Sequence, residues 1–133
     1  MAHTIELRTD HLDVLVVDAH PQDYVNLAAN CAARGVRFQF ATSGTDALKL
    51  WRTAARSVWL VNIHLPDGSG CDLAAAIRAR DPHSVVYLVG DQYDPAEELI
   101  ARMAGGAMYV CKPADSAWLS LADVPIRVLS RCA

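Results

Sequence analysis

Residues 13–21 read DVLVVDAHP, an apolar run that ends in an acidic residue, Asp18, and then in a proline, Pro21. A nearly continuous apolar run of this length is typical of a strand that is covered on both faces, as in a parallel sheet. Proline is tolerated in the first turn of a helix. The stretch therefore predicts a buried strand that is followed directly by a helix.

Four further β-type runs follow along the chain. They are VRFQF at residues 36–40, VWLV at 58–61, VVYLV at 85–89 and MYVC at 108–111. Three of the five runs are almost continuously apolar, which predicts strands buried on both faces. The run at 36–40 instead alternates apolar and polar residues, so we expect that strand at the edge of the sheet.

Helical periodicity separates these runs. The apolar positions that define it are Tyr24, Leu27, Ala28 and Cys31; Ala47, Leu48, Leu50, Trp51 and Ala54 after a start near Thr45 or Asp46; Leu73, Ala74 and Ile77 between Cys71 and Arg80; and Leu99, Ile100 and Met103 after a start near Pro95. Gly35, Asp81-Pro82 and Gly105-Gly106 predict helix ends. The last segment, residues 116–131, contains Pro125, so we expect a short or kinked helix there.

Strict alternation of strands and helices predicts an α/β domain with a five-stranded parallel sheet, right-handed crossovers and helices on both faces. In such sheets the functional site lies beyond the carboxyl ends of the strands. The residues that follow those ends are Asp18, Ala19 and His20; Asn62 and His64; Gly90 and Asp91; and Lys112.

Length and composition limit the class of protein. The chain has 133 residues, 53% of them apolar and 20% charged, which predicts one globular domain at 12–133 after a short N-terminal tail at 1–11. The net charge of −3 without a basic patch argues against direct binding to nucleic acid. No run suits a signal peptide or a membrane span, so we expect a soluble, cytoplasmic protein.

The cysteines do not suggest a disulfide framework or a zinc site. Cys31, Cys71, Cys111 and Cys132 lie far apart and form no CxxC pair. We expect reduced thiols that pack in the core, except for Cys132, which we expect to be exposed near the chain end.

Three segments resemble the receiver domains of response regulators in two-component signalling. They are VLVVDAHP at residues 14–21, VNIHLPDGSG at 61–70 and GGAMYVCKP at 105–113, in the order and at the spacings of that family. The resemblance covers about residues 12 to 122. It implies a flavodoxin-like (βα)5 three-layer fold, with the strand order 2-1-3-4-5.

The resemblance also implies a phosphorylation site. In the family, two acidic residues after the first strand and an acceptor Asp after the third strand hold Mg²⁺, which prefers oxygen ligands. The acceptor carboxylate attacks a phosphoryl donor and forms an acyl phosphate. A Ser or Thr after the fourth strand and a Lys after the fifth strand then bind the phosphoryl group.

This sequence keeps only part of that set. Asp18 matches the first acidic position, and Lys112 matches the lysine. Tyr109 stands at the aromatic position that changes rotamer on activation in the family. Because this sequence lacks two of the three carboxylates of the family's pocket, we expect Lys112 to face less negative charge than in the family. We therefore expect it to pair with Asp18 and to bond the Asn62 side-chain oxygen, which would hold the pocket in one state.

Three positions depart from the family pattern. Asn62 stands at the acceptor position, Ala19 at the second acidic position and Gly90 at the hydroxyl position. A carboxamide is no nucleophile, and fewer anionic ligands weaken Mg²⁺ binding or abolish it. We therefore predict a phosphorylation-independent pseudo-receiver that is not an enzyme, needs no cofactor and has no metal site beyond the residual Asp18.

Other interpretations stay open at this point. A working receiver could use a non-standard acceptor, with Asp67 or Asp91 as candidates. A flavodoxin-like binder of a nucleotide or another small ligand is a second alternative, although the loop at 19–23 lacks small hydroxyl residues. His20 and His64 together with Asp18 could form a transition-metal site, although solvated loop histidines are the default.

The partners implied by the resemblance are other signalling proteins, such as a histidine kinase or a downstream regulator. We expect protein–protein contact, or a homodimer, through the face formed by the fourth helix, the fifth strand and the fifth helix. Trp118 is a candidate contact on that face. Arg127 and Arg131 are too few to indicate DNA binding.

Overall fold

The computed structural model describes residues 13–51, 57–104, 108–115 and 117–118. The predicted tail at 1–11 and most of the predicted last helix lie outside these residues, as do Arg127, Arg131 and Cys132. Within the described part of the chain, no helix is both long enough and apolar enough to cross a membrane.

Five parallel strands form the central sheet. They are β1 (Asp13–Val17), β2 (Arg37–Ala41), β3 (Ser57–Asn62), β6 (Val85–Gly90) and β7 (Met108–Cys111). Their order is β2-β1-β3-β6-β7, which confirms the predicted order 2-1-3-4-5. The amphipathic strand β2 lies at an edge, as its alternating sequence predicts.

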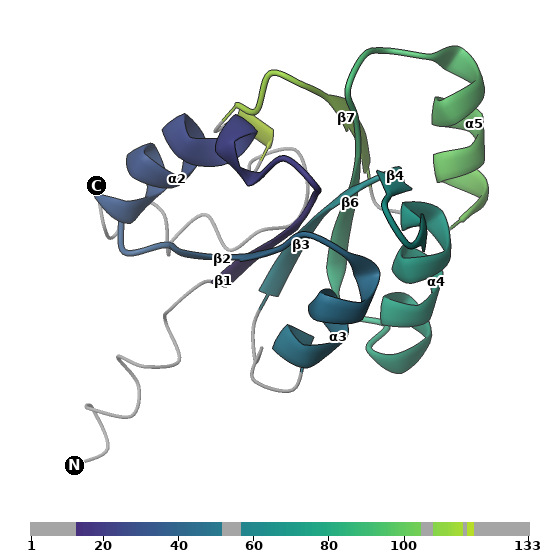
Figure 1. The fold of residues 1–133 in the computed structure, drawn as a ribbon, viewed down its shortest axis with the longest axis horizontal. Coiled ribbons are helices and arrows are strands. Elements are labelled where there is room, and N and C mark those ends of the chain that lie inside the picture. Colours follow the sequence, from purple (N-terminus) through teal and green to yellow (C-terminus); the bar gives the residue numbers. More distant parts are fainter. Residues whose placement is uncertain (1–12, 52–56, 105–107, 116, 119–133) are drawn as a thin grey trace.

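Helices cover both faces of the sheet (Figure 1). They are η1 (Pro21–Tyr24) and α2 (Val25–Ala32) on one face, and α3 (Gly44–Trp51), α4 (Gly70–Arg80) and α5 (Pro95–Met103) on the other. Alternate residues of each strand point to opposite faces, so β1 contributes to two cores. Val14 and Val16 pack with Tyr24 and Leu27 on the α2 face. The predicted α/β three-layer fold is confirmed.

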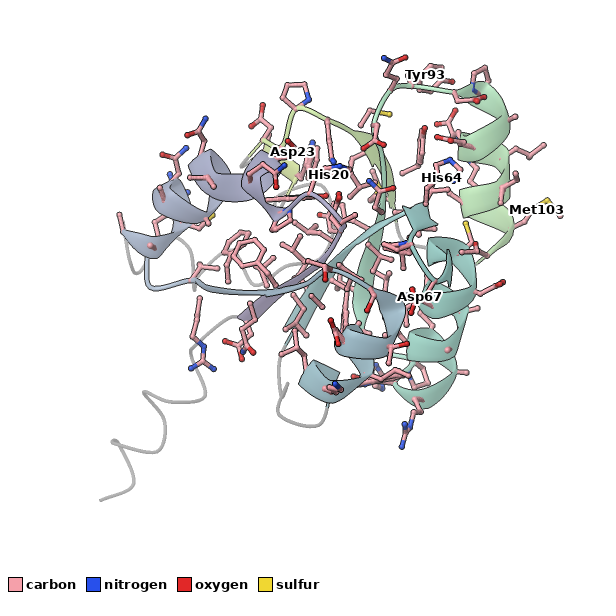
Figure 2. All side chains as sticks on the ribbon, in the orientation of Figure 1. His20, Asp23, His64, Asp67, Tyr93 and Met103 are labelled. Carbon is pink, nitrogen blue, oxygen red and sulfur yellow. The ribbon has the colours of Figure 1, made fainter. Side chains whose placement is uncertain are left out.

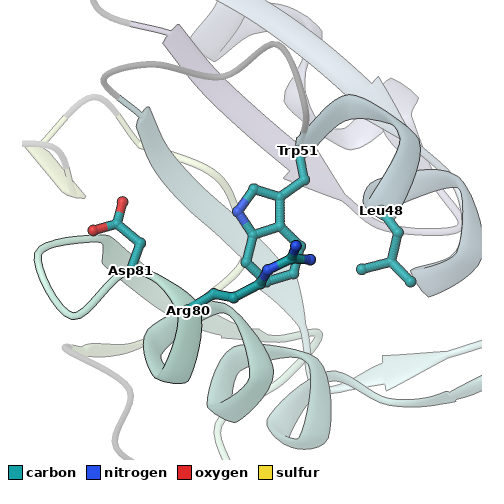
Figure 3. A pocket seen from close by; sticks show the side chains of 4 residues that line it. All are labelled: Leu48, Trp51, Arg80 and Asp81. Atoms are coloured by element: carbon teal, nitrogen blue, oxygen red, sulfur yellow. The ribbon is translucent and has the colours of Figure 1, made fainter.

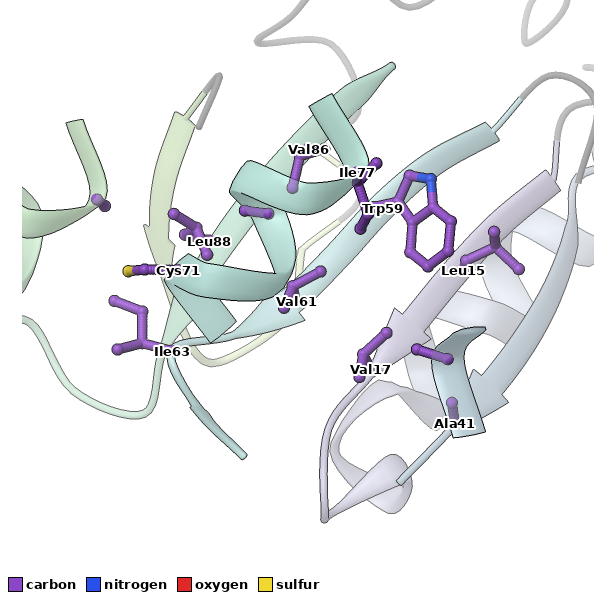
Figure 4. Close-up of a cluster of buried hydrophobic side chains, with 13 residues drawn as sticks. Leu15, Val17, Ala41, Trp59, Val61, Ile63, Cys71, Ile77, Val86 and Leu88 are labelled. Carbon is purple, nitrogen blue, oxygen red and sulfur yellow. The ribbon is translucent and has the colours of Figure 1, made fainter. Parts of the chain in front are cut away.

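The second core is filled by the other residues of the same strands (Figure 4). Leu15 and Val17 of β1 pack there with Trp59, next to Ala74 and Ile77 of α4. All five side chains are almost completely buried. Helix α4 is therefore held against the centre of the sheet, as its predicted apolar face requires.

A short antiparallel hairpin follows β3. It consists of β4 (His64–Leu65) and β5 (Gly68–Ser69). The Ser69 side chain then caps α4 by accepting a hydrogen bond from the Cys71 N–H at 3.1 Å. The hairpin thus fixes the start of α4 close to the carboxyl end of β3.

Helix α5 is oriented differently from what its apolar residues suggest. Leu99, Ile100 and Met103 are 60%, 52% and 80% exposed, and Ala101 is the one buried residue of the helix. The helix packs beside β7, at the edge of the sheet, so that a narrow side of it is covered. The three apolar side chains that mark this helix in the sequence therefore lie largely in the solvent.

The tryptophans of the described residues pack mainly in the interior. Trp59 and Trp118 are buried, and the Trp118 carbonyl accepts a hydrogen bond from the Tyr87 hydroxyl. Trp118 is therefore not the surface contact that the sequence suggests. Trp51 is half-buried between α3 and α4, where the Arg80 guanidinium lies 5.1 Å from its ring centroid (Figure 3).

The close approach of Gly70 to the end of β3 gives a first prediction. A Cβ atom on Gly70 would lie 1.9 Å from the Asn62 carbonyl oxygen. We expect Gly70→Ala to lower the free energy of unfolding by about 3 kcal/mol, as severe overpacking does. Urea unfolding measures this, with Gly44→Ala as control, because a Cβ there would meet the Asp67 side chain at an ordinary 3.4 Å. Equal costs for both variants would contradict the prediction.

Candidate functional site

The carboxyl ends of four neighbouring strands bring the predicted site residues together. Asp18 follows β1, Asn62 ends β3, Asp91 follows β6 and Lys112 follows β7. Because β1, β3, β6 and β7 are adjacent and parallel, these ends meet at the same edge of the sheet. The contacts among these side chains show what the site can do.

Asp18 lies at the centre of the site and is 1% exposed. Its Oδ2 accepts hydrogen bonds from the Tyr24 hydroxyl at 2.7 Å and from Asn62 Nδ2 at 2.9 Å, and Lys112 Nζ lies 3.0 Å away. Its Oδ1 accepts from the His20 N–H at 2.9 Å. A carboxylate offers about four acceptor positions, so protein donors already use the acceptor capacity of Asp18.

These partners determine the protonation of Asp18. Burial alone would raise its pKa, because burial disfavours the charged form. The hydrogen bonds from the His20 N–H and from Tyr24, Asn62 and Lys112 outweigh burial and hold the pKa of Asp18 below its usual value. Burial and the nearby Asp18 charge raise the pKa of Tyr24 well above its usual range. Asp18 is therefore ionised and Tyr24 is neutral at physiological pH.

Lys112 contacts three carboxylates. Its Nζ lies 2.7 Å from Asp23 Oδ2, 2.9 Å from Asp91 Oδ1 and 3.0 Å from Asp18 Oδ2, and its side chain is 11% exposed. An ammonium group has three N–H donors, so each can be directed at one carboxylate. The ion pair with Asp18 forms as predicted, but the expectation of reduced negative charge around Lys112 is wrong.

Asp23 is the functional residue that the sequence reasoning missed. It lies in the single turn of η1, directly after the loop that leaves β1, and is 42% exposed. Pro21 marks the start of that turn in the sequence, so it could have placed an acidic side chain near the sheet edge. Figure 2 shows Asp23 and His20 on this side of the molecule.

The carboxylates and Lys112 shift one another's pKa. Burial alone would lower the pKa of Lys112, but Asp23, Asp91 and Asp18 outweigh it and hold that pKa well above its usual value. The hydrogen bond with Lys112 in turn lowers the pKa of Asp91, against a smaller opposing effect of burial. The Lys112 ammonium therefore stays charged among the carboxylates of Asp18, Asp23 and Asp91.

Asn62 uses its amide group to join two carboxylates. Its Nδ2 donates to Asp18 at 2.9 Å and to Asp91 at 3.1 Å, and the side chain is buried. Its Oδ1 accepts from the His64 N–H at 2.8 Å. The predicted hydrogen bond from Lys112 to this oxygen is therefore wrong, because the oxygen faces the following backbone and the carboxylates attract Lys112.

Gly90 leaves room for the hydroxyl of Tyr109. A Cβ atom at Gly90 would lie 2.6 Å from Tyr109 Oη. That hydroxyl donates to Glu97 Oε1 at 3.0 Å and accepts from the Asp94 N–H at 3.3 Å. Burial is the main reason that the pKa of Tyr109 is raised. Tyr109 is thus held over Gly90 by the first turn of α5.

The two histidines of the site do not converge. His20 Nδ1 lies 3.7 Å from Asp18 Oδ1, whereas His64 Nε2 lies 2.7 Å from Glu97 Oε2 on α5. Across the described ranges of the chain, no group of three or more His, Cys, Asp or Glu side chains could hold a metal ion. The alternative of a metal site formed by two histidines and Asp18 is therefore wrong.

Asp67 is used as a helix cap. Its Oδ1 accepts from the Gly44 N–H at 2.9 Å, and its Oδ2 accepts from the N–H and hydroxyl of Thr45 at 3.0 and 2.8 Å. These donors, the Gly44 N–H first, lower the pKa of Asp67. Its oxygens serve the start of α3, away from the cluster around Asp18.

Comparison with known proteins gives a consistent assignment. The family model for the Response regulator receiver domain matches residues 14–122. Transcriptional regulatory protein KdpE of Mycobacterium tuberculosis is 32% identical over 100 residues, which cover 75% of this chain and 44% of KdpE. The probable transcriptional regulatory protein TcrX of the same organism is 31% identical over 116 residues, which cover 86% of this chain and 47% of TcrX. The chain thus spans less than half the length of these relatives.

Solved structures share the fold. A response regulator protein from Burkholderia pseudomallei, crystallised with a phosphorylated aspartic acid, a calcium ion and citrate, has a TM-score of 0.73 to this structure at 24% identity. The match covers 90% of this chain and 69% of that chain. At this level of identity the likeness shows the fold alone.

Removal of the Lys112 charge tests the electrostatics of the site. We expect Lys112→Met to lower the free energy of unfolding at pH 7 by about 3 kcal/mol, because it leaves the buried Asp18 without its cation. The lowered pKa values of Asp18 and Asp91 stabilise the fold above their unfolded value of 3.8, and this contribution is lost as the pH falls through their folded values. The difference between wild type and variant should therefore shrink below about pH 4.

Urea unfolding between pH 3 and pH 7 measures this difference. Lys49→Met is the matched control, because Lys49 is 77% exposed and pairs with Asp46 on the surface at 3.6 Å. We expect the control to change the free energy of unfolding by less than about 0.5 kcal/mol at every pH. An equally small effect of Lys112→Met would contradict the role given to the cluster.

A double-mutant cycle tests the contact between Gly90 and Tyr109. We expect Gly90→Ala to cost about 2 kcal/mol of unfolding free energy in the wild type, because the new Cβ overlaps Tyr109 Oη. The cost should fall by about 1 kcal/mol in a Tyr109→Phe background, where that oxygen is absent. Equal costs in the two backgrounds would show that the hydroxyl does not occupy this space.

Proposed function

The chain belongs to the response regulator receiver domain family, and from that premise we propose that it is a pseudo-receiver, a signalling module that acts by protein–protein contact without being phosphorylated. The observation that carries this proposal is the internal pairing of the pocket. Lys112 is shared among three carboxylates, and the acceptor positions of Asp18 are used by protein donors.

The chemistry of Asn62 supports the proposal. The residue ends β3, where the resemblance places the phospho-acceptor, and its amide nitrogen is directed at Asp18 and Asp91. The lone pair of that nitrogen is delocalised into the carbonyl group, and the amide oxygen carries no full charge. Neither atom can attack a phosphoryl donor as a carboxylate does. An acyl phosphate is therefore not expected at residue 62.

The residues present do not fit Mg²⁺. This cation requires about six oxygen ligands in nearly ideal octahedral geometry. Ala19 offers no side-chain ligand, and the Asn62 oxygen faces the His64 N–H. Asp18 would have to give up donors that are already in place, and Lys112 already supplies positive charge among the carboxylates. We propose that the pocket works without a metal cofactor.

The arrangement of Gly90 and Tyr109 supports a single conformation of the face that includes α5 and β7. Gly90 has no hydroxyl that could follow a phosphoryl group, and a side chain there would collide with Tyr109. Glu97 on α5 and the Asp94 N–H hold the Tyr109 hydroxyl in its position over Gly90. We propose that this position does not depend on phosphorylation.

The partners proposed from the family are a histidine kinase or a downstream regulator, through the face that includes α5 and β7. The names of the curated relatives, KdpE and TcrX, support a role in the regulation of transcription. Because the chain matches less than half of these relatives, the activity of the whole relatives is not transferred to it.

Intact mass measurement after incubation with Mg²⁺ and a small acyl-phosphate donor tests the proposal. We expect no mass gain of one phosphoryl group on the wild-type chain. We also expect none on Asn62→Asp, because Ala19 supplies no second acidic ligand and Gly90 supplies no hydroxyl. A receiver domain with a complete acidic pocket, treated in parallel, should gain one phosphoryl group and is the positive control.

Two results would contradict this expectation. Stoichiometric labelling of the wild type would show that another residue, such as Asp91, acts as acceptor. Efficient labelling of Asn62→Asp alone would show that the carboxamide is the single obstacle, and that Ala19 and Gly90 matter less than proposed.

A further inference from the structure

Exposed apolar side chains gather on one segment of the chain. The large hydrophobic residues that are exposed in the described part of the structure are Val25, Phe40, Leu48, Tyr93, Leu99, Ile100 and Met103. The last four lie on α5 or on the loop directly before it, and we call them the α5 stripe. Figure 2 shows Met103 on the outer side of α5, pointing away from the sheet. Isolated exposed apolar residues are normal, but a cluster marks a surface that a partner covers.

Negative charge borders the α5 stripe. Asp91, Asp94, Glu97 and Glu98 lie at its N-terminal end, and we call them the acidic margin. Three of them, with His64, Gln92 and Tyr93, line an open cavity of about 300 Å³. Arg102 is the basic residue of α5, and it lies 3.5 Å from Glu98. The ammonium of Lys112 contacts one member of the margin, Asp91, and otherwise pairs with Asp18 and Asp23.

We propose that the α5 stripe and the acidic margin together form the docking surface for an amphipathic basic helix of another protein. Apolar side chains of that helix would cover Leu99, Ile100 and Met103, and its Lys or Arg side chains would lie against the acidic margin. This is the helix-on-surface mode of recognition, in which apolar anchors supply affinity and complementary charge supplies rate and selectivity. The inference rests on the proposed function as an interaction module and names the chemistry of its partner.

The charges favour such a partner over a second copy of this chain. In a two-fold pairing of antiparallel α5 helices, the acidic margin of one copy would meet the C-terminal half of the other. That half offers Arg102 as its basic residue, and Arg102 is already next to Glu98. Each acidic margin would thus face a half-helix whose one cation is already paired, so a second copy offers it less complementary charge than a basic helix does.

Two synthetic peptides of about 14 residues test the proposal. One alternates Leu and Lys with helical periodicity, and the other has Glu in place of every Lys. We expect the basic peptide to bind the wild-type chain at least about tenfold more tightly than the acidic peptide in a calorimetric titration, and its affinity to fall with added salt. Equal affinity of the two peptides would overturn the charge assignment.

Matched variants show whether binding occurs at the α5 stripe. Leu99→Ser and Met103→Ser remove exposed apolar groups there, and Val25→Ser removes one that is 58% exposed on α2, on the other face of the sheet. We expect each stripe variant to weaken the basic peptide about tenfold and the Val25 variant to leave it unchanged. Because all three side chains are exposed, the variants should unfold at the same urea concentration as the wild type. Equal losses in all three would overturn the location.

A second pair of variants tests the acidic margin. Glu98→Gln removes one charge there, and Asp72→Asn removes one from the exposed start of α4. We expect Glu98→Gln alone to weaken the basic peptide and to reduce the salt dependence of binding. Equal effects of the two variants would indicate attraction to the net charge of the chain, and would overturn the proposal.

Sedimentation of the chain alone separates the remaining outcomes. We expect a monomer that Leu99→Ser does not alter. A dimer that Leu99→Ser dissociates would make a second copy the occupant of the stripe and would overturn the proposed partner, while contact through this face would still stand. Failure of the proposed function has a different readout, the mass gain of one phosphoryl group, so the two failures can be told apart.

Discussion

The burial of one charged carboxylate constrains the rest of this site. Asp18 is 1% exposed, and a charge in such a place is destabilising unless donors surround it. The donors come from different elements: Tyr24 from η1, Asn62 from β3 and Lys112 from the end of β7. These elements must keep their positions for the Asp18 carboxylate to keep its hydrogen bonds. The pocket therefore also links η1, β3 and the end of β7 structurally.

The same requirement gives a reason for the amide at residue 62. Asp18, Asp23 and Asp91 already place three negative charges around the single ammonium of Lys112. A carboxylate at residue 62 would add a fourth negative charge and would remove the two N–H donors that join Asp18 to Asp91. Asn62 supplies those donors without adding charge. An amide at residue 62 thus suits a pocket that already holds three carboxylates and one ammonium group.

The fold could be predicted further from the sequence than the contacts within the site. Apolar runs such as Val14–Val17 predict strands that are buried on both faces. Parallel strands also place their carboxyl ends at one edge of the sheet, whatever their side chains are. The partners of Lys112 depend on where the turn of η1 directs Asp23, which no periodicity encodes. Helical spacing likewise identifies the common face of Leu99 and Met103, but not whether that face meets the sheet or the solvent.

The pocket and the α5 surface are connected by direct contacts. Asn62 accepts the His64 N–H, the His64 ring contacts Glu97, and Glu97 accepts the Tyr109 hydroxyl that Gly90 leaves room for. A phosphoryl switch would have to break the pairing of Lys112 and move Tyr109 against these contacts. Under the proposed function both ends of this chain of contacts stay fixed, so the α5 stripe is always presented. Regulation of such a module then depends on the supply of its partner, since its own shape does not change.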